Sequence, residues 1–241
     1  MTSTLVDEQS IWAATVQMPV ASSLKISTDA DVCIVGGGIT GLTTAYLLMK
    51  SGKRVLVVDD GPLASGETQD TTAHLSSALD DGFTNIERWH GAGGARLAAE
   101  SHAAAIDRIE AIAHEIHADC DFRRVDGYLF RAPEDGGKDD LLEEELAAAR
   151  RAGLVHAELV EKAPLDSFHT GLAIRFPNQA RFHPLKYLST MACAIEAGGG
   201  VIHTQSHVDR IEGGKPARIK VGDLLITAEA VVVATNSPIN D

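Results

Sequence analysis

The chain has 241 residues, of which 44% are hydrophobic, and its formal net charge is -13 at pH 7. This length and apolar content are sufficient for one large globular domain or two smaller ones. The negative charge argues against nucleic acid and anionic membrane surfaces as partners, because both would repel the protein. No stretch reaches the ~18 apolar residues of a membrane span, and the first ten residues lack a signal-peptide pattern, so we expect a cytoplasmic protein.

The cysteines and histidines give no pattern of a metal site. No C-x-x-C pair occurs among the three cysteines, which are Cys33, Cys120 and Cys193. Neither a disulfide framework nor a zinc or iron-sulfur site is therefore expected. His114 and His117 are three residues apart in an expected helix, but no third ligand is near them, so we predict no metal there. His203 and His207 are interpreted as structural residues, because the strand on which they are expected need not bring them together.

Residues 1–29 contain Pro19 and several Ser and Thr and show no clear periodicity. We interpret them as an arm that lies on the surface of the following domain, with Ile11 and Trp12 as its anchors. A disordered tail is the alternative, because chain termini are ordered only where tertiary contacts hold them.

An apolar strand then runs into a glycine-rich turn and directly into a helix with an apolar face. The turn has the pattern G-x-G-x-x-G, formed by Gly36, Gly38 and Gly41. In this pattern the first glycine permits the tight turn, the second lets the backbone approach a diphosphate, and the third lets the helix pack close to the strand. The N–H groups near Ile39 and Thr40 have no partner within the helix, so they favour a bound anion. The pattern indicates a dinucleotide-binding unit.

The next strand, at residues 54–59, is apolar from Val55 to Val58 and ends on the acid Asp59. Asp59 lies 18 residues after Gly41, close to the roughly 20 expected for the carboxylate that binds the ribose hydroxyls of the dinucleotide. Its charge would repel a 2′-phosphate, which argues against NADP. The alternative is an α/β unit that merely turns at its glycines, with Asp59 and Asp60 as turn residues.

The connection at residues 61–76 is long and rich in Ser and Thr. Loops in this position, beyond the carboxyl end of a parallel strand, are where open α/β sheets bind ligands. A solvated linker is the alternative, since Ser and Thr are ordinary loop residues.

The middle of the chain is expected to hold two amphipathic helices and several short strands. The expected helices are at 89–117 and 138–152, and the apolar face of the first is formed by Leu97, Ala105, Ile109, Ile112 and Ile116. The expected strands are a pair within 122–131 around the turn Asp126-Gly127, and segments at 172–176 and 180–182.

Pro184 is expected to begin a further helix, which ends at the glycines 198–200. Short strands are expected at 201–203, 208–212, 218–221 and 224–226. The closing segment 231–236 is again apolar and ends in small polar residues. If it returns to the first sheet, its carboxyl end reaches the same crevice as the glycine turn. Well over a hundred residues separate it from the second strand, and this interruption favours an FAD-binding fold over an NAD domain.

The chain resembles the FAD-dependent oxidoreductases of the D-amino-acid oxidase and glycine oxidase type, and within them the flavoproteins that carry a C-terminal Rieske iron-sulfur domain. The stretches that carry the resemblance are Ser10–Trp12, Asp31–Asp60, Gly61-Pro62, Gly66–Thr68, Thr71–Ser76, Arg181–Pro184, Gly200–Glu212 and Val231–Asp241. The resemblance implies a Rossmann-like FAD-binding fold of the glutathione-reductase type, with an inserted α+β substrate region. The FAD-binding domain would then comprise 30–80 and 182–241, and the insertion would comprise 81–181.

The resemblance also implies a set of FAD-binding residues. The diphosphate would lie on Gly36, Gly37, Gly38, Ile39, Thr40 and Gly41, and the adenosine would lie beside Asp59, Asp60 and Val208. The ribityl chain and flavin ring would lie along Gly66, Thr68, Thr72, Ala73 and His74, backed by Ala234, Thr235 and Asn236. His74 either takes part through its imidazole or offers only its backbone.

The family pattern further implies that a small substrate, such as an amine or amino acid, gives hydride to the flavin. No catalytic residue is assigned, although Arg131, Arg175 and Arg181 are candidates for pairing with a substrate carboxylate. The chain is shorter than family members and is expected to be a fragment or an abbreviated relative. It lacks the Cys-x-His and Cys-x-x-His pairs of a Rieske cluster, so any Rieske domain or other electron acceptor would lie outside it. The alternatives are an NAD-dependent dehydrogenase and a truncated, non-catalytic nucleotide-binding protein.

Overall fold

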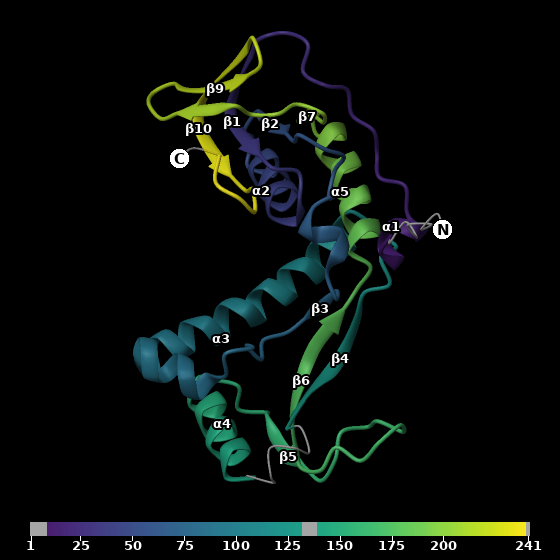
Figure 1. Ribbon diagram of the computed structural model, residues 1–241, viewed down its shortest axis with the longest axis vertical. Coiled ribbons are helices and arrows are strands. Elements are labelled where there is room, and N and C mark those ends of the chain that lie inside the picture. The colour runs from purple at the N-terminus through teal and green to yellow at the C-terminus, as the bar shows by residue number, and fades with distance from the viewer. Residues whose placement is uncertain (1–8, 132–138, 240–241) are drawn as a thin grey trace, which may run out of the picture. The chain divides into compact units, whose positions relative to one another are not determined.

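The computed structural model describes residues 9–131 and 139–239, which form two compact units (Figure 1). The first unit comprises residues 9–72, 115–120 and 183–239, and the second comprises 73–114, 121–131 and 139–182. Each unit has its own sheet and is described separately. The domain boundaries expected from the sequence stay predictions.

The first unit is built on a six-stranded sheet in the order β7-β2-β1-β10-β9-β8. Its strands are β1 (Thr28–Val35), β2 (Val55–Val58), β7 (Val201–His203), β8 (Arg210–Glu212), β9 (Ala217–Val221) and β10 (Leu224–Val233). Strands β7, β2, β1 and β10 run parallel, and β8 and β9 add an antiparallel hairpin edge. The expected return of the closing segment to the first sheet is confirmed, because β10 pairs with β1 from Thr28↔Ile226 to Val35↔Val233. The strands expected at 224–226 and 231–236 form the single strand β10, because Leu224 to Ala228 pair with β9 and the overlapping stretch from Ile226 to Val233 pairs with β1.

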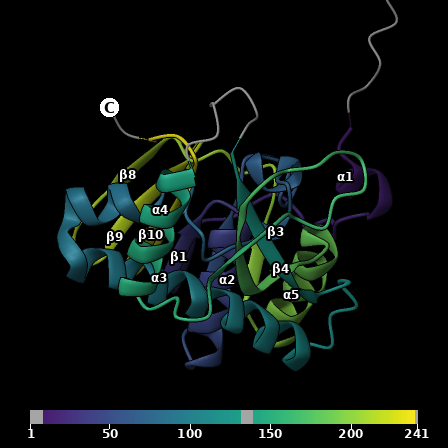
Figure 2. The ribbon, with the colours of Figure 1, turned by 90° about the horizontal axis from the view of Figure 1, so that it is seen from below.

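The helices described in the first unit are α1 (Ile11–Thr15), α2 (Ile39–Lys50), the 3-10 helix η1 (Glu67–Asp70) and α5 (Pro184–Ala197). Of these, α2 and α5 contact strands of the sheet, and α1 and η1 contact α5. Helix α2 contacts α5, β1 and β2 (Figure 2). Pro184 occupies the first turn of α5 and Gly198 caps its end, as the sequence predicted. The other side of the sheet buries a cluster that includes Cys33, Leu56 and Ile219, and burying a side chain of the size of Leu or Ile stabilises the fold by roughly 1.5–3 kcal/mol.

The three cysteines differ in burial and therefore in their expected reactivity towards thiol reagents. Cys33 is fully buried on β1, and desolvation raises the pKa of its thiol to about 12; Cys120 is buried as well, whereas Cys193 is exposed. Because the thiolate is the reactive form, we expect a thiol reagent at about pH 8 to modify only Cys193 in the native protein and all three cysteines after unfolding. Rapid labelling of Cys33 in the folded chain, detected by mass spectrometry, would contradict its place in the core.

The second unit has a smaller sheet in the order β3-β6-β4, with β5 paired to β6. Its elements are β3 (His74–Leu75), α3 (Phe83–Glu115, whose last residue belongs to the first unit), β4 (Arg123–Phe130), α4 (Asp139–Arg151), β5 (Glu158–Val160) and β6 (Ala173–Arg181). Helix α3 is interrupted at Gly91 and begins before the expected residue 89. Its expected apolar face is wrong in part: Leu97 and Ala105 are exposed, and Ile106, which was not expected, is buried. Ile112 is buried and Ile109 and Ile116 are partly buried, as expected.

The hairpin expected around Asp126-Gly127 is also wrong. Strand β4 continues through both residues, and β6 is likewise one strand instead of two. The ladder passes from Val125↔Gln179 to Gly127↔Phe176, so Pro177 and Asn178 of β6 lie opposite Asp126 alone. This is a β-bulge: Asn178 takes a left-handed conformation with φ 62°, and a bulge tolerates the missing N–H of proline. The residues at the bulge are of types that are common in turns. For that reason the sequence predicts chain reversals where the structure has a bulge.

Among the described residues, no helix combines the length and apolarity that a membrane span needs.

Candidate functional site

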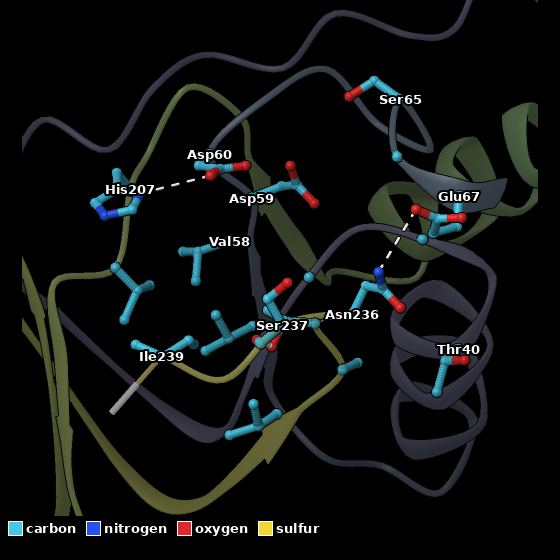
Figure 3. Close-up of a pocket in the computed structure, with 18 of the residues that line it drawn as sticks. Thr40, Val58, Asp59, Asp60, Ser65, Glu67, His207, Asn236, Ser237 and Ile239 are labelled. Carbon is cyan, nitrogen blue, oxygen red and sulfur yellow. Dashed lines mark hydrogen bonds and ion pairs between the residues drawn. The ribbon is translucent and has the colours of Figure 1, made fainter. Parts of the chain in front are cut away.

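A crevice of about 960 Å³ opens in the first unit at the carboxyl ends of β1, β2 and β10 (Figure 3). Twelve of the expected cofactor-binding residues line it: Gly36, Gly38, Ile39, Thr40, Asp59, Asp60, Gly66, Thr68, Val208, Ala234, Thr235 and Asn236. They come from separate stretches of the chain that the parallel strands bring to one edge of the sheet. A switch point of this kind is where open α/β sheets bind nucleotides.

The turn after β1 requires a glycine at its first position. Gly36 has φ +109°, which side-chain-bearing residues rarely adopt, and a Cβ there would lie 2.6 Å from the carbonyl oxygen of Ala234. The end of β10 is held against this turn, because the Ala234 N–H donates to the carbonyl of Val35 at 2.8 Å. The Gly36 N–H in turn donates to the carbonyl of Val58 at 2.9 Å. Three strand ends therefore meet at the turn.

Helix α2 starts directly at this turn, with Gly38 as its N-cap. Its first helical hydrogen bond runs from the Leu42 N–H to the Gly38 carbonyl at 3.0 Å, and the Ile39 N–H donates instead to the Thr68 hydroxyl at 3.3 Å. A Cβ on Gly38 would meet only that hydroxyl, at 3.1 Å. The backbone at Gly38 and Thr40 therefore borders the crevice with little between it and a ligand. This cradle, at the positive end of a helix, fits a diphosphate.

Gly37 and Gly41 do not line the crevice but shape it. A Cβ on Gly41 would lie 1.8 Å from the Gly36 carbonyl oxygen, so its missing side chain permits the close approach of helix and turn. The Gly37 N–H donates to the carboxylate of Asp59 at 2.5 Å.

The Asp59 carboxylate joins the glycine turn to the end of β2. One oxygen accepts the Gly37 N–H, and the other accepts the Gly61 N–H at 2.9 Å. Asp59 lies at the crevice, as the sequence predicts. Its bond to Gly61, two residues on, has the spacing of a local Asp turn, whereas no residue spacing indicates its bond to Gly37. A second lone pair on each oxygen is left for other donors, and the expected contact with ribose stays a prediction.

Asp59→Asn is expected to lower the free energy of unfolding by about 1–2 kcal/mol, because the amide nitrogen cannot accept one of the two backbone N–H groups. Urea denaturation of the protein without cofactor measures this change. Asp60→Asn is the matched control: the Asp60 side chain is 69% exposed, so its loss is expected to change stability by less than about 0.5 kcal/mol. Equal midpoints for Asp59→Asn and the wild type would show that these hydrogen bonds do not stabilise the turn.

Two polar pairs lie at the mouth of the crevice (Figure 3). His207 Nδ1 lies 3.5 Å from a carboxylate oxygen of Asp60, and the Asn236 amide donates to Glu67 at 3.5 Å. The segment carrying His207 is fixed by the Ser206 N–H, which donates to the Asp59 carbonyl at 2.8 Å. The interpretation of His207 as merely structural missed its place in the lining; its position next to Val208 was the available signal.

Three expected flavin-binding residues lie outside the crevice lining. Thr72 is exposed at the end of the loop, while Ala73 and His74 belong to the second unit, where His74 pairs with Arg181 on the neighbouring strand. Their roles at the flavin stay predictions.

Of the arginines considered for a substrate carboxylate, Arg175 is already paired. It donates to Asp126 at 2.7 Å and to Glu158 at 2.5 Å, and these two carboxylates raise its pKa. A substrate would have to displace both.

The sheet order, the glycine turn and the acid at the end of β2 define a dinucleotide-binding fold. A family model described as FAD dependent oxidoreductase (DAO) matches residues 31–239. The chain therefore belongs to this family, whose cofactor is FAD, and the alternatives of an NAD-dependent dehydrogenase and of a non-catalytic protein gain no support. The fold expected from the sequence is confirmed.

Several known proteins are similar to the chain. A putative Rieske 2Fe-2S iron-sulfur protein, YhfW of Bacillus subtilis (strain 168), is 32% identical over 234 residues, which cover 97% of this chain and 45% of that protein. Gamma-glutamylputrescine oxidoreductase of Escherichia coli (strain K12) is 28% identical, with 91% and 52% covered. The structure of L-amino acid deaminase from Proteus myxofaciens has a TM-score of 0.72 at 18% identity, over 95% of this chain and 49% of that one. The chain thus spans about half the length of the curated relatives it matches.

Proposed function

We propose that the first unit binds FAD in its crevice, and that the chain is the FAD-binding part of an oxidoreductase that moves hydride from an amine or amino acid to the flavin. The single observation that carries the proposal is the crevice itself, where the glycine turn, the Asp59 carboxylate and the end of β10 meet. The names of two relatives support the substrate class, since one is a gamma-glutamylputrescine oxidoreductase and one is an L-amino acid deaminase.

The proposed roles follow from the chemistry of the lining. The backbone at Gly38 and Thr40 would hold the diphosphate through N–H groups and the α2 dipole. Asp59 and Asp60 lie one strand away and would accept hydrogen bonds from the adenosine ribose, with the apolar side chain of Val208 against the adenine. The segment 234–236 would lie along the cofactor from the other side of the turn.

The flavin itself supplies the redox chemistry, and the protein supplies binding, orientation and electrostatics. The electron acceptor or Rieske domain is proposed to lie outside this chain, which the name of the Bacillus relative supports. A cytoplasmic location is part of the same proposal.

The absorption spectrum of the purified chain tests the proposal. We expect visible flavin bands, and FAD as the molecule released on denaturation. Under anaerobic conditions, an amine or amino acid from a panel of both is expected to bleach the flavin bands. A colourless protein that takes up no FAD would contradict the proposed site, and release of FMN would contradict the roles of Asp59 and Val208. If FAD binds but no panel member bleaches it, the substrate class is wrong while the cofactor site stands.

A further inference from the structure

We propose that Trp12 is a positioning residue for FAD binding, which holds the loop at residues 66–72 in the shape that completes the crevice; this inference rests on the proposed function. The indole Nε1–H of Trp12 donates to the carbonyl oxygen of Thr71 at 2.8 Å. The two residues are 59 positions apart in the chain, so the bond joins the N-terminal arm to the cofactor loop. The sequence predicts both Ile11 and Trp12 as anchors of the N-terminal arm. Ile11 is 67% exposed, so Trp12 is the residue that anchors the arm.

Helix α1 has only five residues, too few for stability on its own, so tertiary contacts must hold it. The Trp12 ring meets the His183 ring edge-on, with centroids 4.9 Å apart at 70°. The first turn of α1 is capped by the Ser10 hydroxyl, which accepts the Ala13 N–H at 3.2 Å.

His183 fixes the other end of α1. It is 7% exposed and is the N-cap of α5, where its Nδ1 accepts the Lys186 N–H at 3.3 Å. An accepting Nδ1 places the proton of the neutral ring on Nε2, which therefore donates to the Thr15 hydroxyl at 2.9 Å. The Thr15 hydroxyl in turn donates a hydrogen bond to the Ile11 carbonyl at 2.7 Å. Helix α1 is thus held to His183, at the start of α5, at two points: by the Trp12 ring and by the Thr15 hydroxyl.

The loop that Trp12 holds at Thr71 lines the crevice with residues that come just before Thr71 in the chain. Thr71 follows η1 directly, and within η1 both Glu67 and Thr68 line the crevice. The Thr68 hydroxyl accepts the Ile39 N–H at the start of α2, where the diphosphate is proposed to lie. Fixing Thr71 therefore limits the motion of Thr68, and a loop that is ordered before binding loses less entropy when the cofactor arrives.

The local hydrogen bonds of the loop do not replace this restraint. The Gln69 N–H donates to Gly66 and the Gln69 side chain donates to Ser65, so both bonds stay inside the loop. The Ala64 N–H donates to the Gly37 carbonyl at 3.1 Å and ties down the start of the segment. Trp12 ties down its end.

The test compares Trp12→Ala, which removes the ring and the hydrogen bond, with Trp12→Phe, which keeps a ring against His183 and removes only the bond. We expect the dissociation constant for FAD to rise about tenfold in Trp12→Ala and about threefold in Trp12→Phe, as loss of a hydrogen bond and its packing predicts. Hydrogen exchange of the protein without FAD is expected to be faster at residues 66–72 in both variants. The control is Trp89→Ala: Trp89 is 54% exposed in the second unit, so neither quantity is expected to change.

Wild-type affinity and wild-type exchange in Trp12→Ala would overturn the inference. Faster exchange spread over the whole first unit would also overturn it, because Trp12 would then stabilise the fold in general. A chain that binds no FAD at all refutes the proposed function instead, and the exchange of residues 66–72 still decides whether Trp12 orders the loop.

Discussion

A Gly38→Val chain is expected to fold normally and to lose FAD. Gly38 has φ -80° and ψ -171°, a region of the backbone that valine adopts readily. A Cβ there would meet only the Thr68 hydroxyl, at 3.1 Å, and a side-chain hydroxyl can shift by a few tenths of an ångström. The added methyl groups would occupy the border of the crevice, where the backbone is proposed to approach the diphosphate. FAD affinity should therefore fall at least about a hundredfold, which is about 2.7 kcal/mol.

Two measurements separate binding from folding in this variant. FAD titration followed by flavin fluorescence gives the affinity, and urea denaturation without FAD gives the stability, which we expect to change by no more than about 1 kcal/mol. Gly213→Val is the matched control, because a Cβ there meets nothing within 4 Å and the position is outside the crevice lining. Undiminished FAD binding by a folded Gly38→Val chain would refute the assignment of the diphosphate to this turn.

The parts of this fold that the sequence predicted correctly are those encoded in short stretches. The glycine turn and Asp59 lie within 24 residues of one another, and Gly41 acts on the carbonyl of the nearby Gly36. The return of β10 could also be predicted, because a strand buried in a parallel sheet has a continuous apolar pattern of its own.

The errors arose where distant segments decide the local structure. Asp126-Gly127 has the composition of a turn, yet β6 supplies a bulge opposite it that keeps β4 continuous. The bond from the Gly37 N–H to Asp59 joins the turn after β1 to the end of β2, which are adjacent only in the folded sheet. Trp12 and Thr71 meet only in the folded chain. In each case the sequence shows which types of residue are present, but only the folded structure shows which of them contact each other.

The roles of Gly38 and Gly41 differ in kind, although both belong to one motif. Gly38 borders the crevice, whereas Gly41 is buried between helix and turn. A Cβ on Gly41 would lie 1.8 Å from the Gly36 carbonyl oxygen and 3.3 Å from the Ile34 Cγ2. The Gly36 carbonyl cannot move aside easily, because the Gly36 N–H donates a hydrogen bond to the Val58 carbonyl and the residue packs closely against the Ala234 backbone. Relief therefore requires α2 to separate from β1.

Gly41→Ala is accordingly expected to lower the free energy of unfolding by about 3 kcal/mol or more, since even one inserted methyl group in a tightly packed site displaces backbone. Urea denaturation without FAD measures this loss of stability. In Gly38→Val the same experiment is expected to show little loss of stability. Gly213→Ala adds the same methyl group where no atom lies within 4 Å, so its midpoint should match the wild type within error. A Gly41→Ala chain as stable as the wild type would mean that helix and turn are further apart than described, and the diphosphate cradle would lose the close packing that positions its N–H groups.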